Sequence, residues 1–303
     1  MPTLKWKRAG GRGLQEAEAL LREREPYCVG AAFRFLARTS QDRLWIAKSY
    51  PGGPMIRRPA GLLLYSRGIL FPVFHLSPSD AAEFLAGGIP LPPFFSPLQS
   101  GRPLHAAQGP ADDMDLLETA LDRRGLFASL RWEYELRGLD LYQPLQGKAP
   151  GDDDRAAPDL VIRRPETEDL DALYPLQMDY EREEVLPPGA EFNPAACRAG
   201  LEYLIKTGMI LIACLKDQVV GKININAQSF TRFQIGGVYV LPGFRGQGIA
   251  RAMTAALIRL LAPRKKRFTL FVKKTNIPAR RVYDYVGFSK IADYRINYYR
   301  TGP

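Results

Sequence analysis

One segment in the second half of the sequence combines residue types that suit phosphate binding. It runs from Val238 to Ala250, reads VYVLPGFRGQGIA, and passes from a predicted strand through a turn into a predicted helix. Gly246 and Gly248 let the backbone turn tightly and let its N–H groups approach a ligand without an obstructing Cβ. The first N–H groups of a helix have no partner inside it, and the helix dipole makes this end positive, so the turn suits a pyrophosphate. Arg245 adds a permanent positive charge. A purely structural turn is the alternative.

A second segment further along the chain predicts a short helix that carries Tyr283. Thr275 or Asn276 can cap its start, and Pro278 suits its first turn. Gly287 suits the left-handed residue just beyond its end. Taken alone, the pattern is equally met by a core helix in which Tyr283 is an amphipathic aromatic.

Both segments lie within an alternation of predicted strands and helices. Hydrophobic periodicity predicts strands at 160–163, 209–216, 219–229, 233–240 and 267–273, helices at 170–178, 195–206, 249–261 and 278–286, and a closing strand region at 288–299. The pair Gly236–Gly237 interrupts one strand, where we expect a bulge or a splay of the sheet. The order predicts an α/β (α+β) domain in which helices flank a mixed sheet.

The two segments together resemble the GNAT superfamily of acyl-CoA-dependent N-acyltransferases. The family's turn pattern is Arg or Gln, two residues, Gly, one residue, then Gly or Ala, and Arg245, Gly248 and Ala250 match it. After a predicted strand, the second segment reads NxxAxxxYxxxGF, in the order that the family has. The resemblance covers residues 159–303 and implies a mixed, mainly antiparallel sheet. It also implies acetyl-CoA as the acyl donor and no metal ion.

The resemblance implies roles for particular residues. The backbone of 238–240 would pair with the pantetheine arm where two central strands splay apart, and the turn at 245–250 would hold the pyrophosphate. Tyr283 would protonate the departing thiolate, since a phenol with a pKa near 10 stays protonated at neutral pH. For Arg280, as for Lys273 and Lys274, contact with an outer phosphate and a solvated basic face are both open. The implied cofactor-binding residues are Val238, Tyr239, Val240, Arg245, Gly246, Gln247, Gly248, Ile249, Ala250, Asn276 and Arg280.

The general base is not evident from the sequence. Many family members use a carboxylate on the strand before the turn, but FQIGGVYV contains none. The remaining candidates lie in the segment that borders the acceptor cleft in the family: Glu181, Glu183, Glu184 and Glu191. A solvent-exposed acid is the simpler explanation for each. A water chain, or an acceptor of low pKa, would remove the need for a base.

Composition limits the classes of function. The net charge of +10, from 42 Lys and Arg against 32 Asp and Glu, favours a polyanionic or phosphorylated partner. Two histidines and three scattered cysteines suggest neither a metal site nor a disulfide framework. We expect no membrane span and no secretory signal, because no apolar run is long enough and the basic start is not followed by one. The expected location is therefore the cytoplasm.

The chain is expected to contain two domains. Residues 149–158 lie in KAPGDDDRAAPD, which has the composition of an interdomain linker. Residues 1–148 predict an α+β domain with a helix at 14–25, a strand at 43–49, a hairpin of 61–65 and 69–76, a short helix within 77–88, a helix at 112–121 and a strand at 131–141. This domain has no turn motif of its own, and its element order fits a degenerate copy of the GNAT fold.

The sequence therefore predicts an N-acetyltransferase that moves an acetyl group from acetyl-CoA to an amine by direct attack in a ternary complex. A non-catalytic acyl-CoA-binding or sensing protein is the alternative. The expected partner is a small-molecule or peptide amine, with no nucleic acid and no membrane, and a homodimer stays open. The residues do not identify the acceptor.

Overall fold

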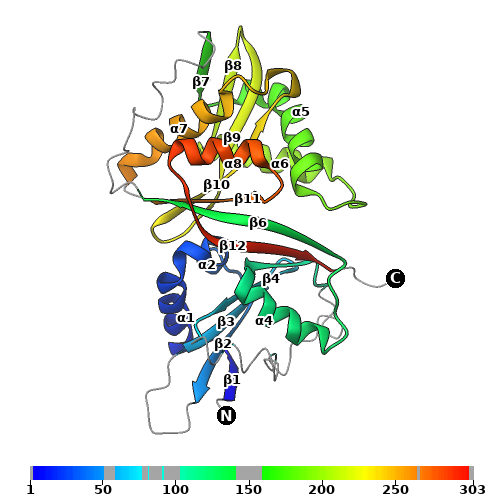
Figure 1. The fold of residues 1–303 in the computed structure, drawn as a ribbon, viewed down its shortest axis with the longest axis vertical. Helices are drawn as coiled ribbons and strands as arrows, with labels where there is room; N and C mark the ends of the chain where they lie inside the picture. Colours follow the sequence, from blue (N-terminus) through cyan, green and yellow to red (C-terminus); the bar gives the residue numbers. More distant parts are fainter. Residues whose placement is uncertain are drawn as a thin grey trace. The chain divides into compact units, whose positions relative to one another are not determined.

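The computed structural model describes residues 3–50, 59–76, 81, 91, 103–140, 159–264 and 267–299 (Figure 1). The chain divides into two compact parts: unit 1 comprises residues 1–136 and 291–303, and unit 2 comprises residues 137–290. This division differs from the predicted domains 1–148 and 159–303, because the closing strand of the chain is part of unit 1. The predicted linker 149–158 lies outside the described residues, and its position stays a prediction.

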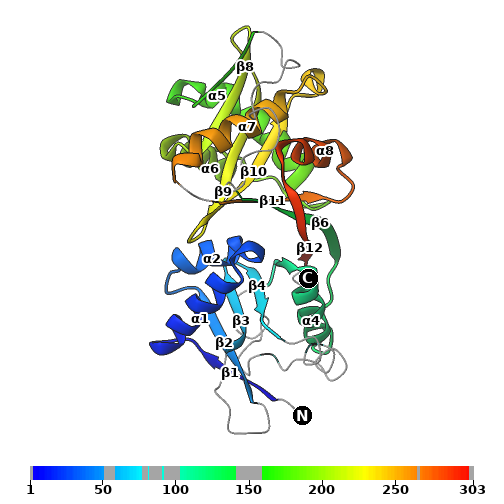
Figure 2. The same cartoon turned by 60° about the vertical axis from the view of Figure 1, so that its left-hand side comes forward.

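Unit 1 is built on a sheet with the strand order β1-β2-β3-β4-β5-β12-β6. Neighbours from β1 to β4 are antiparallel, β4 and β5 run parallel, and β5 and β12 are antiparallel. Helices α1 and α2 cover one face and α4 covers the other (Figures 1 and 2). The elements are β1 (Thr3–Arg8), α1 (Arg12–Glu23), α2 (Val29–Leu36), β2 (Arg43–Tyr50), β3 (Pro59–Ser66), β4 (Ile69–Phe74), β5 (Ala106–Pro110), α4 (Ala111–Asp122), β6 (Leu130–Leu139) and β12 (Ser289–Tyr298).

Strand β3 is buried on both faces, which explains its continuous apolar run GLLLYS. Successive side chains of a strand alternate between its faces. Leu63 packs with Met114 and Leu117 of α4 in one core, while Leu62 and Leu64, both fully buried, point to the opposite face. The unit therefore has a hydrophobic layer on each side of its sheet.

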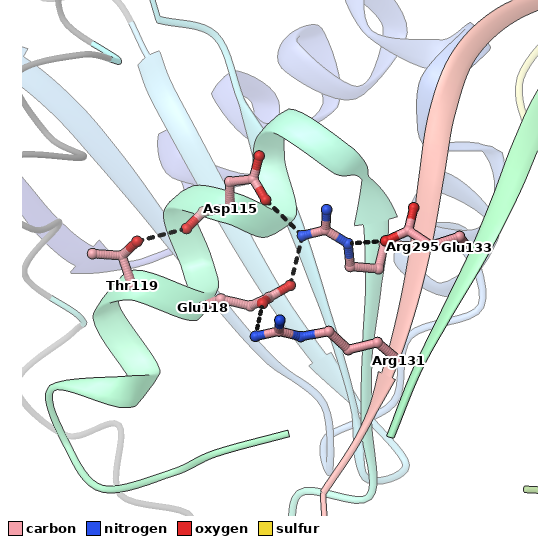
Figure 3. A network of polar contacts seen from close by, with 6 residues as sticks. All are labelled: Asp115, Glu118, Thr119, Arg131, Glu133 and Arg295. Atoms are coloured by element: carbon pink, nitrogen blue, oxygen red, sulfur yellow. Dashed lines mark hydrogen bonds and ion pairs between the residues drawn. The ribbon is translucent and has the colours of Figure 1, made fainter. Parts of the chain in front are cut away.

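A group of charged side chains attaches the last strand to unit 1 (Figure 3). The guanidinium of Arg295 on β12 donates to Asp115 at 2.6 Å and to Glu118 at 2.8 Å, both on α4, and to Glu133 on β6 at 2.8 Å. Arg131 forms a second ion pair with Glu118 at 2.6 Å. One arginine thus links a helix and two strands, and this long-range network has no counterpart in any local sequence pattern.

Unit 2 has the strand order β7-β8-β9-β10-β11, with antiparallel neighbours up to β10 and a parallel β10–β11 pair. Helices α7 and α8 contribute to one core and α5 and α6 to another, so each face of the sheet is covered. The elements are β7 (Leu160–Arg163), α5 (Leu170–Tyr180), the π-helix η3 (Glu181–Val185), α6 (Pro194–Thr207), β8 (Ile210–Leu215), β9 (Gln218–Gln228), β10 (Arg232–Val240), α7 (Ile249–Leu261), β11 (Arg267–Lys273) and α8 (Ile277–Val286).

The two units repeat one topology. In each, a first strand is followed by helices and then by three strands that pair antiparallel in sequence order, and the next strand pairs parallel with the third of these. The parallel pairs are β4–β5 in unit 1 and β10–β11 in unit 2, and each second strand of the pair leads into a helix, α4 or α8. The sequence predicted such a second copy.

Most predicted elements are present, with three omissions. The sequence reading missed β1, α2 and β5, whose segments are short or, in β5, made of small residues. The hairpin of β3 and β4 is confirmed, and Arg67 and Gly68 in its turn both have positive φ, as the right-handed twist of the strands favours. Of the helix predicted within 77–88, the structure describes residue 81 alone, so this helix stays a prediction. Among the described helices, none combines the length and apolar character needed to cross a bilayer.

Candidate active site in unit 2

The central strands of unit 2 separate beside the predicted turn. Strands β10 and β11 pair in parallel over three positions only, the last of which joins Gln234 to Thr269. In the described residues, positions 235–240 of β10 have no paired residue on β11. The register between β10 and β9 also shifts, between Gly236 and Tyr239, so residues 237–238 form a bulge. The sequence predicted a bulge or a splay at the glycine pair: the bulge is present there, and the described pairing with β11 ends two residues earlier, at Gln234.

Gly237 is the residue that the bulge requires. Its φ is +58°, in the left-handed region that residues other than glycine rarely adopt. A Cβ at this position would lie 1.7 Å from Oδ1 of Asn224. The peptide groups around Gly237 are held by side chains: its N–H donates to the phenol oxygen of Tyr180 at 3.3 Å, and its carbonyl accepts from Nζ of Lys222 at 2.9 Å.

Lys222 is completely buried on β9, directly beneath the bulge. Its Nζ lies 3.4 Å from Oδ1 of Asn224 and 4.3 Å from the centre of the Tyr180 ring. Burial lowers the pKa of Lys222 to about 7, although the charge of Glu181 acts in the opposite direction. The sequence reading did not select Lys222, Asn224 or Tyr180. The one available signal was the alternation KININ, which places polar side chains on the same face of a buried strand.

The turn between β10 and α7 has the tight, left-handed backbone conformation that its two glycines predicted. Gly246 and Gly248 have φ of +81° and +77°, and Gly248 is the N-cap of α7. Gln247 and Gly246 are exposed, so the backbone of the turn faces solvent. Arg245 instead turns toward the strand and donates from Nε to the carbonyl of Val240 at 3.0 Å.

The π-helix η3 carries three of the four acids considered as bases, and each has a polar partner. Glu181 accepts from Gln177 at 2.8 Å. Glu183 accepts from the Tyr239 hydroxyl at 2.7 Å and from Arg245 at 3.0 Å. Burial acts against ionisation of Glu183, but these hydrogen bonds outweigh it and lower the pKa of its carboxyl.

The other two acids differ in their surroundings. Glu184 pairs with Lys273 of β11 at 3.0 Å, which connects the π-helix to the strand beside the splay. Glu191 is exposed, in the loop before α6. The predicted acids therefore do not form one cluster.

Helix α8 presents Tyr283 to the core of unit 2. Asn276 caps the helix by accepting from the N–H of Ala279 at 3.1 Å, and Gly287 ends it with φ of +98°. Tyr283 is 7% exposed, and burial raises the pKa of its phenol, with Tyr180 contributing in the same direction. Its side chain therefore lies near the Tyr180 that contacts the bulge.

The predicted basic residue Arg280 lies in the first half of α8, and Arg137 of unit 2, which the sequence reading did not select, contacts the C-terminal end of the helix. Arg280 donates to the carbonyl of Lys274 at 3.3 Å, so its guanidinium stays close to the loop before the helix. Arg137, a buried residue at the end of β6, forms an ion pair with Asp284 and donates to the carbonyl of Phe288 at 3.4 Å. Arg137 thereby fixes the helix that carries Tyr283.

Within the described residues of unit 1, the strand pair β3–β4, which corresponds to β9–β10, differs from its counterpart in unit 2. Its β3–β4 register runs from Gly61 to Ser66 with no shift, so it has no bulge. A Cβ on Gly61 would lie 2.6 Å from the ring of Phe74, and the N–H of Phe74 donates to the buried carboxyl of Asp113 at 3.3 Å. At the β3–β4 pair of unit 1, the side chains of Phe74 and Asp113 therefore occupy the space beside the strands.

Solved structures with the same fold cover nearly the whole chain. A Drosophila protein is 15% identical, with 97% of this chain and 98% of that chain covered and a TM-score of 0.62. A GCN5-related N-acetyltransferase from Sphaerobacter thermophilus is 17% identical, with 97% and 94% covered and a TM-score of 0.59. A tandem GNAT protein from the clavulanic acid biosynthesis pathway is 13% identical, with 99% of each chain covered and a TM-score of 0.51. The fold is thus the GNAT fold in a two-domain arrangement, as predicted.

The sequence itself carries the family pattern in unit 2. Residues 170–288 match the profile of the Acetyltransferase (GNAT) family, and this part of the chain is a GNAT acetyltransferase domain. No curated protein matches the chain in sequence. The family supports acyl transfer as the general activity of unit 2.

Proposed function

We propose that unit 2 binds acetyl-CoA and transfers its acetyl group to an amine by direct attack in a ternary complex. The observation that carries the proposal is the departure of β10 from β11 after Gln234, immediately before the glycine turn at 245–250. A strand that has no neighbour along one edge offers the backbone N–H and C=O groups of that edge to an extended ligand. The helix N-terminus beyond it suits a pyrophosphate.

The proposed cofactor contacts follow from this layout. The backbone of 238–240 pairs with the pantetheine arm, and the N–H groups of 246–250 bind the pyrophosphate. Asn276 uses its Oδ1 to cap α8, which leaves its amide NH₂ for the pantetheine region. Arg280 lies beside the same loop and can meet an outer phosphate.

In the proposed step, the amine nitrogen attacks the thioester carbonyl carbon and the C–S bond breaks. The leaving thiolate takes a proton from the phenol of Tyr283, which its raised pKa keeps protonated at neutral pH. The new ammonium loses its proton to water or to one of the acids on η3. The products are an N-acetyl amine and free CoA, with no covalent enzyme intermediate.

A second candidate function is a non-catalytic acyl-CoA-binding or sensing protein, and a specific observation favours it. Strand β10 carries no carboxylate, and the acids on η3 are engaged with Gln177, Tyr239, Arg245 and Lys273. Release of thiol from acetyl-CoA separates the two functions. A panel of amines should include amino acids, polyamines, aminoglycosides and peptides with free N-termini or lysines. Amine-dependent thiol release supports the transferase, and binding of acetyl-CoA without release with any amine supports the sensor.

The acceptor is proposed to be a small-molecule or peptide amine rather than a nucleic acid, and a homodimer is a further open proposal. The cytoplasm is the proposed location, because Cys28, Cys197 and Cys214 are all free.

A further inference from the structure

Lys222 is a buried amino group that the proposed reaction does not yet use. A lysine without solvent exposure is costly unless its polar end has partners. Its partners are concentrated at one place: the carbonyl of Gly237, the amide oxygen of Asn224 and the ring of Tyr180. All three surround the bulge of β10, beside the backbone of 238–240 that is proposed to pair with the pantetheine arm.

Geometry connects Lys222 to a backbone donor on the other side of the strand. The described chain has no cis peptide bond, so the carbonyl of Gly237 and the N–H of Val238 point in opposite directions from one planar peptide. Nζ of Lys222 holds that carbonyl at 2.9 Å, beside the ring of Tyr180 on α5. The N–H of Val238 therefore points away from Nζ of Lys222, and the β9–β10 register skips residues 237 and 238.

The preceding peptide is fixed in the same way. The N–H of Gly237 donates to the hydroxyl of Tyr180, and the amino group of Lys222 lies over the ring of the same tyrosine. Gly237 has the most permissive backbone of any residue type, so without these contacts its two peptide planes would be free to rotate. Lys222 and Tyr180 together select one orientation.

We propose that Lys222 is a positioning residue that orients and polarises the Gly237–Val238 peptide, so that the N–H of Val238 donates to the thioester carbonyl of bound acetyl-CoA. The inference rests on the proposed function and deepens it. A hydrogen bond to a peptide oxygen strengthens the donor at the other end of that peptide. As attack places negative charge on the thioester oxygen, a donor that is already aligned stabilises that charge without reorganising.

The test uses the full-length protein and acetyl-CoA labelled with ¹³C at the carbonyl. Lys222→Met keeps most of the apolar stem and removes the donor, and Lys206→Met on the exposed face of α6 is the matched control. Infrared spectroscopy reports the stretching frequency of the bound thioester carbonyl, which falls when the oxygen is hydrogen-bonded. Calorimetry reports the Kd of acetyl-CoA for each protein, and steady-state rates report kcat with an amine found in the panel.

We expect wild type and Lys206→Met to show the same lowered frequency, and Lys222→Met to return it toward the value of free acetyl-CoA. The Kd should change by less than about threefold, while kcat falls about 10- to 100-fold, below the loss caused by deleting an oxyanion donor itself. Lys222→Gln, which retains an N–H donor, should recover part of the shift and of kcat. It also provides the readout if Lys222→Met does not fold.

An unchanged carbonyl frequency in Lys222→Met and Lys222→Gln, with acetyl-CoA bound as in wild type, would overturn the positioning role and leave the proposed function standing. Absence of acetyl-CoA binding to wild type is a different result, because it would remove the proposed function itself.

Discussion

The guanidinium of Arg245, in the glycine turn before α7, donates a 3.0 Å hydrogen bond to the carboxylate of Glu183 on the π-helix η3. Their side chains are 50% and 45% exposed, so the pair is accessible to competing anions. In the proposed complex the pyrophosphate and Glu183 compete for the same arginine. The ion pair therefore couples the turn that is proposed to bind the cofactor to the acid-bearing π-helix.

Replacing Glu183 with Gln should tighten acetyl-CoA binding about two- to fivefold at low salt. The reason is that a half-exposed ion pair contributes roughly 0.2–1 kcal/mol, which the cofactor no longer has to displace. Titration calorimetry at low and high ionic strength measures this, and the gain should shrink as salt screens the pair. Glu202→Gln, in the exposed Arg198–Glu202 pair of α6, should leave the affinity unchanged. Weaker binding by Glu183→Gln would contradict the competition.

Tyr283→Phe should lower kcat by roughly 10²- to 10⁴-fold with little change in the Kd of acetyl-CoA, the range expected when a general acid is removed. Tyr285→Phe is the control, because Tyr285 lies on the same helix and is 58% exposed. Stopped-flow or steady-state thiol release gives the rates. Unchanged turnover in Tyr283→Phe would rule out proton donation by this phenol.

Gly237→Ala should destabilise the protein by about 2–4 kcal/mol, because it combines a left-handed backbone with a clash against Asn224. Gly243→Ala is the control: a Cβ there meets no atom within 4 Å, and we expect a change within about 0.5 kcal/mol. Denaturant unfolding compares the two. Equal stabilities would mean that the bulge is not fixed as described.

Lys222→Met should change how stability depends on pH. Burial lowers the pKa of Lys222 in the folded protein to about 7 from 10.5, so above pH 7 the unfolded chain binds more protons than the folded one. The free energy of unfolding of the wild type therefore rises with pH between about 7 and 10.5. Below about pH 7, Lys222 is charged in both states, and its burial destabilises the folded protein most.

Between pH 7 and pH 9, the free energy of unfolding of the wild type should rise by about 2 kcal/mol relative to that of Lys222→Met. Tyrosines and cysteines titrate in both proteins and cancel in the difference. Unfolding free energies at several pH values give the comparison, and a difference that does not vary with pH would show that Lys222 keeps an ordinary pKa.

Local patterns were sufficient to predict much of unit 2. The caps of α8 at Asn276 and Gly287, the turn glycines and the interrupted strand β10 are all short-range features, and each is present. Such features depend on the backbone conformation of a few neighbouring residues, and the types of those residues are enough to predict it.

The rest depends on contacts between distant residues. The return of β12 to unit 1 is supported by Arg295 and acids more than a hundred residues away in sequence, and no periodicity encodes that pairing. The segment Glu181–Val185 is a π-helix, and no element was predicted there from the sequence. The burial of Lys222 could not be foreseen either, because the fold, not the residue type, places it under Gly237.

The most direct test of the account is calorimetric titration of acetyl-CoA into wild type, Gly248→Trp and Gly243→Trp. Gly248 is the N-cap of α7, so a tryptophan there should block the pyrophosphate turn, whereas Gly243 is exposed and outside that turn. Circular dichroism and thermal unfolding establish that the variants are folded. We predict that wild type and Gly243→Trp bind with the same affinity and that folded Gly248→Trp binds at least about a hundredfold more weakly, about 2.7 kcal/mol. No binding to wild type, or undiminished binding to Gly248→Trp, would contradict the cofactor site.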